Sequence, residues 1–347
     1  MSMKEPSKLG LVPPSTVLVT GSSGYIGQSL VAELLRVGAC ALIVCHYRSN
    51  ESRARLEALV ALCGETPRTR CVFARFDLGC DDAAAIGAAL TAATPLPIDA
   101  VVNCAAWISL KMCDAQPEAA MKINAPIGLL DALALQRRQP LPRFVQLSTD
   151  KVFDGVQARG RGGYDESAAT RPLQTYGATK RACEIILAER WCDRAVSLRL
   201  SVVLGKEAPV PIKGREMFLD FVASALRRRP RGGATFFDDE LLSFTALDDV
   251  VRICARFCAA PVWPICAQQI LHLGSPRSLS RHGIACRVAS HLGISPSNAV
   301  AVHSPRIAGG RVPRNTTMNS MAAERVFGPM AGMDRVIQGL PPRSAGL

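Results

Sequence analysis

The chain has 347 residues, 48% of them hydrophobic and 20% charged, the composition of an ordinary globular protein with a substantial core. Its formal net charge of +12 is spread thinly. One compact basic run, RRRPR at 227–231, lacks the interleaved aromatic residues that stack on bases, so we expect no nucleic-acid partner. Every hydrophobic run falls short of the ~20 residues that cross a bilayer, so we expect no membrane partner either.

Cysteine usage and the first residues of the chain indicate a cytoplasmic protein. The 13 cysteines stand singly in apolar contexts such as LIVCHY and VVNCAAW, without a CxxC pair or a histidine cluster. This pattern favours reduced, buried thiols and predicts no structural metal. The first residues, MSMKEPSKLGLVPPS, contain neither an apolar segment nor an arginine-rich amphipathic one, so they do not resemble a targeting signal.

Short strands alternate with helices through the first part of the chain. The β-branched run TVLVT leads into a glycine-rich turn and then into apolar residues at helical spacing. Strands that alternate with helices of about 10 to 15 residues predict an α/β fold, a Rossmann-type doubly wound parallel sheet with helices on both faces. The expected strands are 16–20, 41–47, 71–78, 98–106, 143–149 and 196–205, and helices after the first one are expected at 54–64, 81–91 and 117–135.

The alternation loosens after residue 205. A loop with two prolines leads to an expected helix at 216–229, and apolar periodicity returns in LDDVVRICARFC at 247–258. We therefore expect a Rossmann domain at 15–205, with a segment near 240–275 that returns to its sheet. A smaller α+β lobe at 206–340, interleaved with that domain, is expected to bind the substrate.

Three glycines in TGSSGYIG, namely Gly21, Gly24 and Gly27, lie between the first strand and the first helix. In a dinucleotide fingerprint the first glycine permits a tight turn, the second lets the backbone approach pyrophosphate, and the third lets the helix pack on the strand. The helix N-terminus then faces the anion. This context favours nucleotide binding over a merely structural turn.

The end of the second strand indicates which dinucleotide would bind. An NAD binder carries an acidic residue there, roughly 20 residues after the turn, whereas this chain has Arg48 and Ser49. A guanidinium pairs bidentately with phosphate, which favours the 2′-phosphate of NADP; Glu51 is nearby, and an exposed loop arginine is the alternative. Asp77, at the end of the third strand, is placed either to touch adenine or to cap a helix.

Tyr176 and Lys180, in TYGATKRACE, lie four residues apart and would point the same way from a helix. An ordinary phenol titrates near ~10, and an adjacent ammonium stabilises the phenolate and brings the pKa toward working pH. Because this spacing occurs by chance in many chains, an unremarkable exposed pair is the alternative.

These motifs together resemble the extended short-chain dehydrogenase/reductases. The shared features are TGxxGxxG, NCAA at 103–106, STD at 148–150, and YxxxK. The succession of STDKVFDG, YDESAATRPLQTYGATKRACE, LRLSVVLG and RVPRNTTMNSMAAERVFG further resembles the dTDP-4-dehydrorhamnose reductase group, over about residues 16 to 328. That group also includes the regulatory beta subunit of methionine adenosyltransferase.

The resemblance implies roles for particular residues. NADPH would deliver hydride to a carbonyl carbon while Tyr176, assisted by Lys180, delivers a proton to the carbonyl oxygen, to which Thr149 also donates a hydrogen bond. Asn124 would fix backbone and water behind the lysine, or serve structure alone. The implied catalytic residues are Thr149, Tyr176 and Lys180. The implied cofactor contacts are Gly21, Ser23, Gly24, Tyr25, Ile26, Gly27, Arg48, Ser49, Asp77, Leu78, Cys104, Ala105, Ala106, Asn124, Tyr176 and Lys180. The implied substrate contacts are Trp107, Asp150, Lys151, Arg311 and Asn315, of which the last two have loop structure as the alternative.

Three positions depart from the reductases. Lys151 stands where the subgroup usually has tyrosine, Leu200 where it tends to have threonine, and Trp107 where a smaller or imidazole side chain is common. Since we expect these changes to lie around the sugar while the proton-transfer set is intact, a different substrate fits better than lost chemistry.

The sequence therefore predicts an NADPH-dependent reductase of a nucleotide-linked keto sugar or a related carbonyl. One alternative is an NADP-binding regulatory subunit that holds a partner enzyme of the methionine adenosyltransferase type. Another is a sugar-nucleotide epimerase or dehydratase, for which Asp150 would supply a carboxylate while Lys151 fills the neighbouring position. The expected ligand is a nucleotide-sugar-like small molecule, and the assembly is left open between a homodimer and a complex with a partner enzyme.

Overall fold

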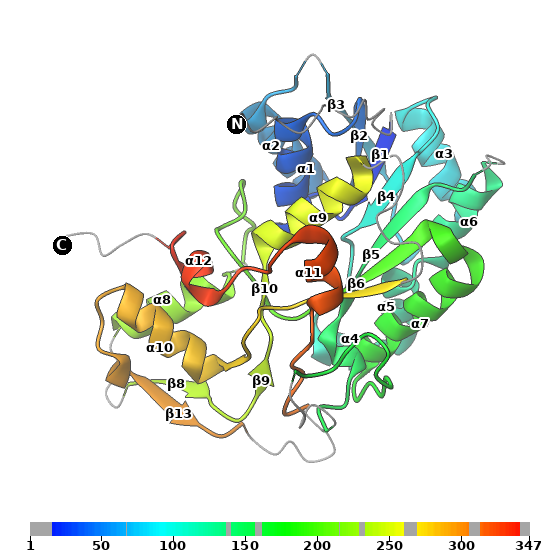
Figure 1. Ribbon diagram of the computed structural model, residues 1–347. Helices are drawn as coiled ribbons and strands as arrows, with labels where there is room; N and C mark the ends of the chain where they lie inside the picture. Colours follow the sequence, from blue (N-terminus) through cyan, green and yellow to red (C-terminus); the bar gives the residue numbers. More distant parts are fainter. Residues whose placement is uncertain are drawn as a thin grey trace, which may run out of the picture.

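The computed structural model describes residues 16–66, 68–136, 140–156, 162–214, 216–228, 233–259, 269–304 and 313–340. Within these residues, a seven-stranded sheet has the order β11-β6-β5-β4-β1-β2-β3 (Figure 1). All its neighbouring strands are parallel. The strands are β1 (Thr16–Thr20), β2 (Leu42–Tyr47), β3 (Arg70–Arg75), β4 (Ala100–Asn103), β5 (Arg143–Thr149), β6 (Ala195–Leu200) and β11 (Ile270–Leu273). The predicted doubly wound parallel sheet is confirmed.

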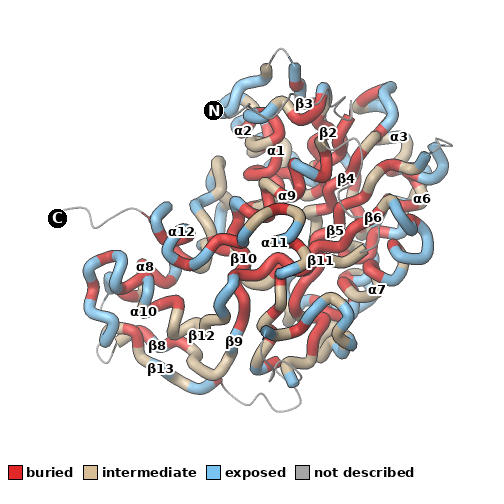
Figure 2. The backbone as a smooth tube through the Cα atoms, viewed as in Figure 1, coloured by how far each residue is buried: buried red, intermediate tan, exposed pale blue. Residues whose placement is uncertain are grey.

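The central strands are apolar along their whole length because helices cover both faces of the sheet. In β1, Val17 and Val19 belong to one hydrophobic core and Leu18 belongs to the other, as the period of two residues in a strand requires. Figure 2 shows the sheet as the buried centre of the molecule.

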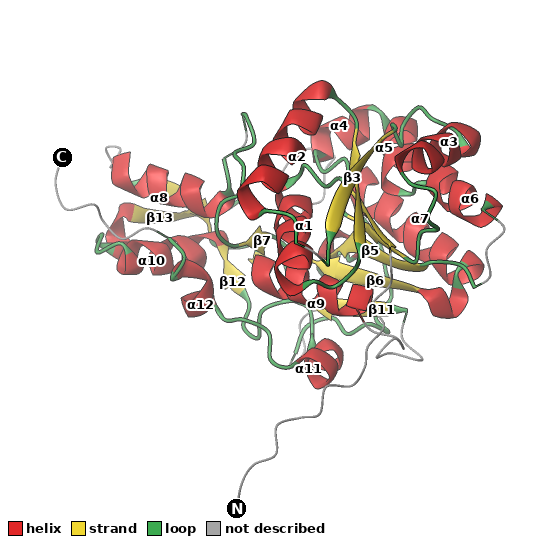
Figure 3. Ribbon diagram, turned by 90° about the horizontal axis from the view of Figure 1, so that it is seen from above, coloured by secondary structure: helices red, strands yellow, loops and turns green. Residues whose placement is uncertain are grey.

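Helices lie on both faces of the sheet, as the view from above shows (Figure 3). The core on one face is shared with α1 (Tyr25–Val37), α2 (Asn50–Cys63), α9 (Leu247–Ala259) and α11 (Met321–Phe327). The core on the other face is shared with α3 (Ala83–Ala93), α6 (Ile127–Leu135) and α7 (Thr175–Arg190), and α4 (Leu110–Ala115) and α5 (Pro117–Asn124) pack on α7.

The helix predicted at 117–135 is wrong as a single element. The structure divides it into α5 and α6, with Ala125 and Pro126 between them. Proline has no backbone N–H to donate, and it disfavours helical conformation in the residue before it, so the helix stops and restarts there.

A second core belongs to a smaller lobe. In it, α8 (Phe218–Arg228), α10 (Arg281–His291) and α12 (Met333–Ile337) pack around the parallel pair β8 (Ala234–Phe237) and β13 (Ala299–Val302). Two short pairs adjoin it, β7 (Val203–Leu204) with β10 (Thr245–Ala246), and β9 (Leu241–Leu242) with β12 (Leu279–Ser280). The short helices η1 (Asp150–Val152), η2 (Cys192–Arg194) and η3 (Pro296–Asn298) complete the described elements.

The chain passes between the two cores more than once. After the lobe helix α8 it returns to the sheet through α9 and β11, enters the lobe again with α10, and then places α11 on the sheet and α12 in the lobe. The division at 205/206, with a return near 240–275, stays a prediction. In the described part of the chain, every helix is too short or too polar to span a bilayer.

Candidate active site

The predicted catalytic residues meet at the carboxyl ends of the strands, where parallel sheets bind ligands. Thr149 is the last residue of β5, and Tyr176 and Lys180 lie in the first two turns of α7. Gly177 makes their approach possible, because a Cβ atom there would stand 2.1 Å from the carbonyl oxygen of Lys151. The first turn of α7 is thereby seated on η1, which brings the Tyr176 phenol near the Thr149 hydroxyl.

Tyr176 does not have the lowered pKa that the sequence predicts. Burial raises the pKa of the phenol, the Asp150 carboxylate raises it further, and the Thr149 side chain opposes both. The direction is upward because removal of water and a neighbouring negative charge both disfavour phenolate. Tyr176 is thus protonated at neutral pH, which is the form that donates a proton.

Lys180 is the unusual group of this site. Its side chain is 1% exposed, and its Nζ has no hydrogen-bond partner among the described residues. Burial lowers the pKa of the ammonium to about 8. A buried ammonium without acceptors is costly, so the surroundings of Lys180 suit a ligand that brings hydroxyl or carbonyl oxygens.

Both polar atoms of the Asn124 side-chain amide hydrogen bond with other residues of the protein. Its Oδ1 accepts from the backbone N–H of Trp107 at 2.7 Å, and its Nδ2 donates to the carbonyl of Trp107 at 3.1 Å and to the Thr179 hydroxyl at 3.0 Å. Asn124 therefore fixes Trp107, which follows Cys104, Ala105 and Ala106 in the segment after β4, against the helix that carries Lys180.

Glu184 joins the end of β5, where Thr149 lies, to α7, which carries Tyr176 and Lys180. Its carboxylate accepts from the Ser148 hydroxyl at 2.6 Å, immediately before Thr149, and it pairs with Arg199 of β6 at 2.8 Å. All these groups are buried, so the charges compensate each other inside the protein. One carboxylate thus holds the end of β5 against α7.

The glycine turn has the geometry that a dinucleotide fingerprint requires. Gly21 has φ +61°, and a Cβ atom there would stand 2.8 Å from the backbone of Ala105. A Cβ atom at Gly27 would stand 2.2 Å from the carbonyl oxygen of Gly21. Gly24 caps α1 without a side-chain hydrogen bond, so the helix N-terminus keeps amides for an anion.

Ser23, Tyr25 and Ile26 take different parts in this turn. The Ser23 carbonyl accepts from Gln28 Nε2 at 3.0 Å. The Tyr25 hydroxyl donates to the carbonyl of Lys206 at 2.9 Å, and Ile26 packs against two hydrophobic cores. The side chains of Tyr25 and Ile26 therefore join the turn to the rest of the protein.

At the end of β2, Arg48 and Ser49 occupy different environments. Arg48 is exposed and lies 3.9 Å from the Asp77 carboxylate. The Ser49 hydroxyl caps α2 by accepting from the backbone N–H of Ser52. Asp77 accepts from the backbone N–H of Gly79 at 2.9 Å, which is a turn-capping role, and Leu78 beside it is buried.

Three contributors to the site are not singled out by the sequence. Arg55 donates to the Ser23 carbonyl at 3.5 Å and pairs with Glu51 at 2.7 Å, and its only sequence signal is the i,i+4 spacing from that glutamate. Gly177 stands unmarked inside YxxxK. His46, in the interior of β2, contacts the glycine turn, and no motif signals it.

The buried Asp150 is an anchor between distant segments. Its carboxylate accepts from the hydroxyls of Ser201 at 2.8 Å and Thr316 at 2.6 Å, and it lies 3.7 Å from the Lys151 ammonium. Leu200 is buried in one of the two cores beside the sheet and is the register partner of Thr149, and its place around the sugar stays a prediction.

Of the lobe residues predicted to bind substrate, Arg311 lies outside the described residues. Asn315 lines a cavity of about 430 Å³ at the end of β11, together with Gly163, Ser275, Arg277 and Met318. Its Oδ1 accepts from the backbone N–H of Thr317 at 3.0 Å. None of the three predicted catalytic residues lines this cavity.

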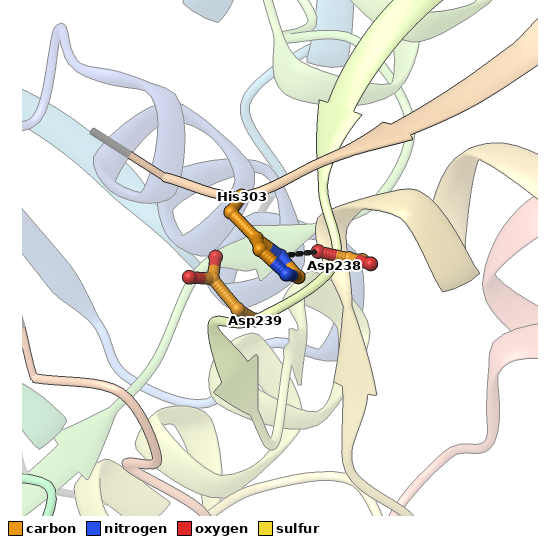
Figure 4. A group of neighbouring side chains, drawn as sticks. All are labelled: Asp238, Asp239 and His303. Atoms are coloured by element: carbon orange, nitrogen blue, oxygen red, sulfur yellow. Dashed lines mark hydrogen bonds and ion pairs between the residues drawn. The ribbon is translucent and has the colours of Figure 1, made fainter.

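One group in the lobe has the composition of a metal site. Asp238, Asp239 and His303 have ligand atoms within 4.8 Å of one another, and Figure 4 shows the His303 ring facing Asp238. Nδ1 of His303 lies 2.8 Å from Asp238 Oδ1, while Asp239 accepts from the Ser304 backbone and pairs with Arg314. These contacts join the segment after β8 to the end of β13, and the absence of a metal stays a prediction.

Comparison with known proteins gives the family. The sequence matches the family described as RmlD substrate binding domain over residues 15–332. It is 28% identical over 314 residues to the dTDP-4-keto-6-deoxy-D-glucose reductase of Streptomyces niveus, covering 87% of each chain. It is 22% identical over 314 residues to methionine adenosyltransferase 2 subunit beta of Rattus norvegicus, covering 90% of this chain and 83% of that one.

A solved structure has the same fold. It is the dTDP-4-dehydrorhamnose reductase of Bacillus anthracis in complex with NADP, with a TM-score of 0.69 and 20% identity over 94% of this chain and 96% of that one. The family match covers nearly the whole chain, the glycine turn and the Tyr176–Lys180 helix included. The chain belongs to the family of the RmlD substrate binding domain.

Proposed function

We propose that the protein is an NADPH-dependent reductase of a nucleotide-linked keto sugar or a closely related carbonyl. The reductase of Streptomyces niveus supports the reaction class, and the NADP complex of the Bacillus anthracis reductase supports the cofactor. In this proposal the sheet domain binds the dinucleotide and the lobe binds the sugar nucleotide. A cytoplasmic location is part of the same proposal.

The observation that carries the proposal is the buried Nζ of Lys180, which has no partner among the described residues. The nicotinamide ribose of a dinucleotide has hydroxyls that would accept hydrogen bonds from this ammonium. Between the glycine turn and Lys180 run the ends of β1, β4 and β5, which is the usual path of a dinucleotide across such a sheet.

The residues present fit NADPH. The amides at the start of α1 would face the pyrophosphate, and Arg48 and Ser49 would lie nearest the 2′-phosphate, with Arg55 behind the turn. When bound, NADPH supplies hydride. Cys104, Ala105 and Ala106 belong to the segment that Asn124 holds, and this segment would line the path between the two ends of the dinucleotide.

Tyr176 would deliver a proton to the carbonyl oxygen of the substrate. Its raised pKa keeps the proton on the phenol until a carbonyl oxygen gains negative charge beside it. Thr149, whose hydroxyl lies near the phenol, would donate to the same oxygen and stabilise that charge. Lys180 would then stabilise the tyrosinate that remains, because a nearby ammonium favours the anion.

On the substrate side, Trp107 and Lys151 are proposed to contact the sugar, and Arg311 and Asn315 the nucleotide. The Asp150 carboxylate already accepts hydrogen bonds from Ser201 and Thr316, which supports an anchoring role over an acid role. A dehydratase is therefore the weaker alternative.

The test is binding and turnover with purified protein. NADPH fluorescence should change on mixing, and absorbance at the NADPH band should fall when dTDP-4-keto-6-deoxy sugars are added. Tyr176→Phe should lower kcat by about 10² to 10⁴ fold, the usual contribution of a general acid, while the Kd for NADPH stays unchanged.

A regulatory subunit is the second candidate, favoured by the similarity to methionine adenosyltransferase 2 subunit beta over 90% of this chain. It would bind NADPH without oxidising it on any sugar nucleotide tested, and it would form a complex with a larger enzyme. That combination would contradict the reductase proposal, whereas turnover that depends on Tyr176 would exclude a purely regulatory role. A homodimer remains the assembly to test if no partner enzyme is found.

A further inference from the structure

His46 connects the second strand to the glycine turn. The backbone N–H of Gly21 donates to Nδ1 of His46 at 3.0 Å, and the other ring nitrogen, Nε2, lies 2.9 Å from the carbonyl oxygen of Phe76. The imidazole is 6% exposed and stacks on the Phe76 ring with a centroid distance of 4.0 Å. Both ring nitrogens are therefore used, one at the turn and one at the end of β3.

These partners define the tautomer. Nδ1 accepts, because the Gly21 amide can only donate, and Nε2 carries the hydrogen, because the Phe76 carbonyl can only accept. A second proton on the ring would place one N–H against another. Burial lowers the pKa of His46 to about 4, so the ring is neutral at physiological pH.

The turn that His46 holds is fixed at several points. The carbonyl of Gly21 accepts from the amide of Gly24 at 2.9 Å. The Ser22 hydroxyl lies 2.7 Å from the carbonyl of Val19 and 3.0 Å from the carbonyl of His46. Hence both the side chain and the backbone of His46 set how the peptides of Gly21 and Ser22 are oriented.

We propose that His46 is a positioning residue for the dinucleotide, which acts by holding the Gly21 amide so that the turn and the N-terminus of α1 face the pyrophosphate. This inference rests on the proposed function, because it assumes that the turn binds NADPH. A side chain that served only to fill the core would affect stability and leave cofactor affinity unchanged.

The matched variants are His46→Asn and His46→Gln. Asparagine places its Oδ1 near the position of Nδ1 and keeps an acceptor for Gly21, whereas glutamine reaches toward Phe76 and loses that acceptor. We expect His46→Asn to bind NADPH within about threefold of wild type, and His46→Gln to raise the Kd about tenfold, the effect of one lost hydrogen bond. The kcat at saturating NADPH should stay within about twofold in both.

The measurements are NADPH fluorescence titration, steady-state kinetics and thermal unfolding of each variant. Equal Kd values for His46→Gln and wild type would overturn the inference, and so would equal losses in His46→Asn and His46→Gln. If neither variant folds, His46 is a structural residue and the inference is also overturned. A wild-type protein that does not bind NADPH contradicts the proposed function itself, so the two failures are distinguishable.

Discussion

The glycine turn and the Tyr176–Lys180 face lie at the same edge of the sheet, yet their polar groups are satisfied in opposite ways. In the turn, the Gly21 amide, the Gly21 carbonyl and the Ser22 hydroxyl all have protein partners. On the Tyr176–Lys180 face, the Lys180 ammonium is buried without one among the described residues. Hydrogen bonds within the protein therefore fix the conformation of the turn. On the Tyr176–Lys180 face, in contrast, burial of the ammonium costs free energy that only a ligand offsets.

Substitution of Lys180 should have the largest effect and tests this contrast directly. Lys180→Met should lower kcat by about 10² to 10⁴ fold, because Tyr176 loses the charge that stabilises its anion. The same change should make the protein more stable. The pKa of Lys180 falls from 10.5 to about 8 on folding, which corresponds to a cost of up to about 3 kcal/mol below pH 8.

The difference in stability between wild type and Lys180→Met should depend on pH. Below pH 8 the lysine is protonated in both states, so the folded wild type bears the full cost. Between pH 8 and 10.5 the unfolded chain holds more protons, so wild-type stability rises with pH and the advantage of Lys180→Met shrinks. Denaturant unfolding at pH 7 and pH 10 measures this, and a less stable variant at pH 7 would contradict the contrast.

Gly27→Ala should lower both the stability of the protein and its affinity for NADPH. The added methyl would stand 2.2 Å from the Gly21 carbonyl oxygen, so α1 must shift, which costs about 1 to 3 kcal/mol or more. The matched control is Gly87→Ala in α3, where the added methyl meets nothing within 4 Å. That control should raise stability by about 1 kcal/mol, and NADPH titration should separate the two variants.

Acid should weaken the fold through His46. The unfolded histidine gains a proton below its ordinary pKa of 6.5, while the folded one resists protonation down to about 4. Stability contributed by the neutral ring is therefore present above pH 6.5 and lost as pH falls toward 4. The charged groups that act on it are Asp77, Arg48 and Asp81. Denaturant unfolding of wild type and His46→Asn from pH 7 to pH 5 should show a shallower decline for the variant.

The smallest expected effect concerns Asp150. Thr316→Val removes a hydroxyl that donates to this buried carboxylate, and it should lower the free energy of unfolding by about 1 to 3 kcal/mol. Thr317→Val is the matched control, because the Thr317 hydroxyl is buried without a partner in the described structure. Equal stabilities of the two variants in urea would contradict the anchoring role.

The sequence predicts the sheet and the glycine turn well because both depend on local patterns. Strands such as β1 are continuous apolar runs, and the spacing of Gly21, Gly24 and Gly27 places them at one turn. The pKa of Tyr176 could not be predicted, since it depends on burial and on Asp150, which is distant in sequence. The contact of His46 with Gly21 is likewise a three-dimensional fact that no spacing encodes.

The bond between Thr316 and Asp150 gives the end of the chain a part in the reaction centre. Thr316 lies 166 positions beyond Asp150, which directly follows Thr149. Loss of the Thr316 hydroxyl would leave every strand of the main sheet in place and still deprive this carboxylate of a donor, beside the Thr149 hydroxyl that we propose faces the substrate. A segment outside the main sheet thus has a part in ordering the proposed reaction centre, so Thr316→Val should lower turnover more than it lowers cofactor affinity.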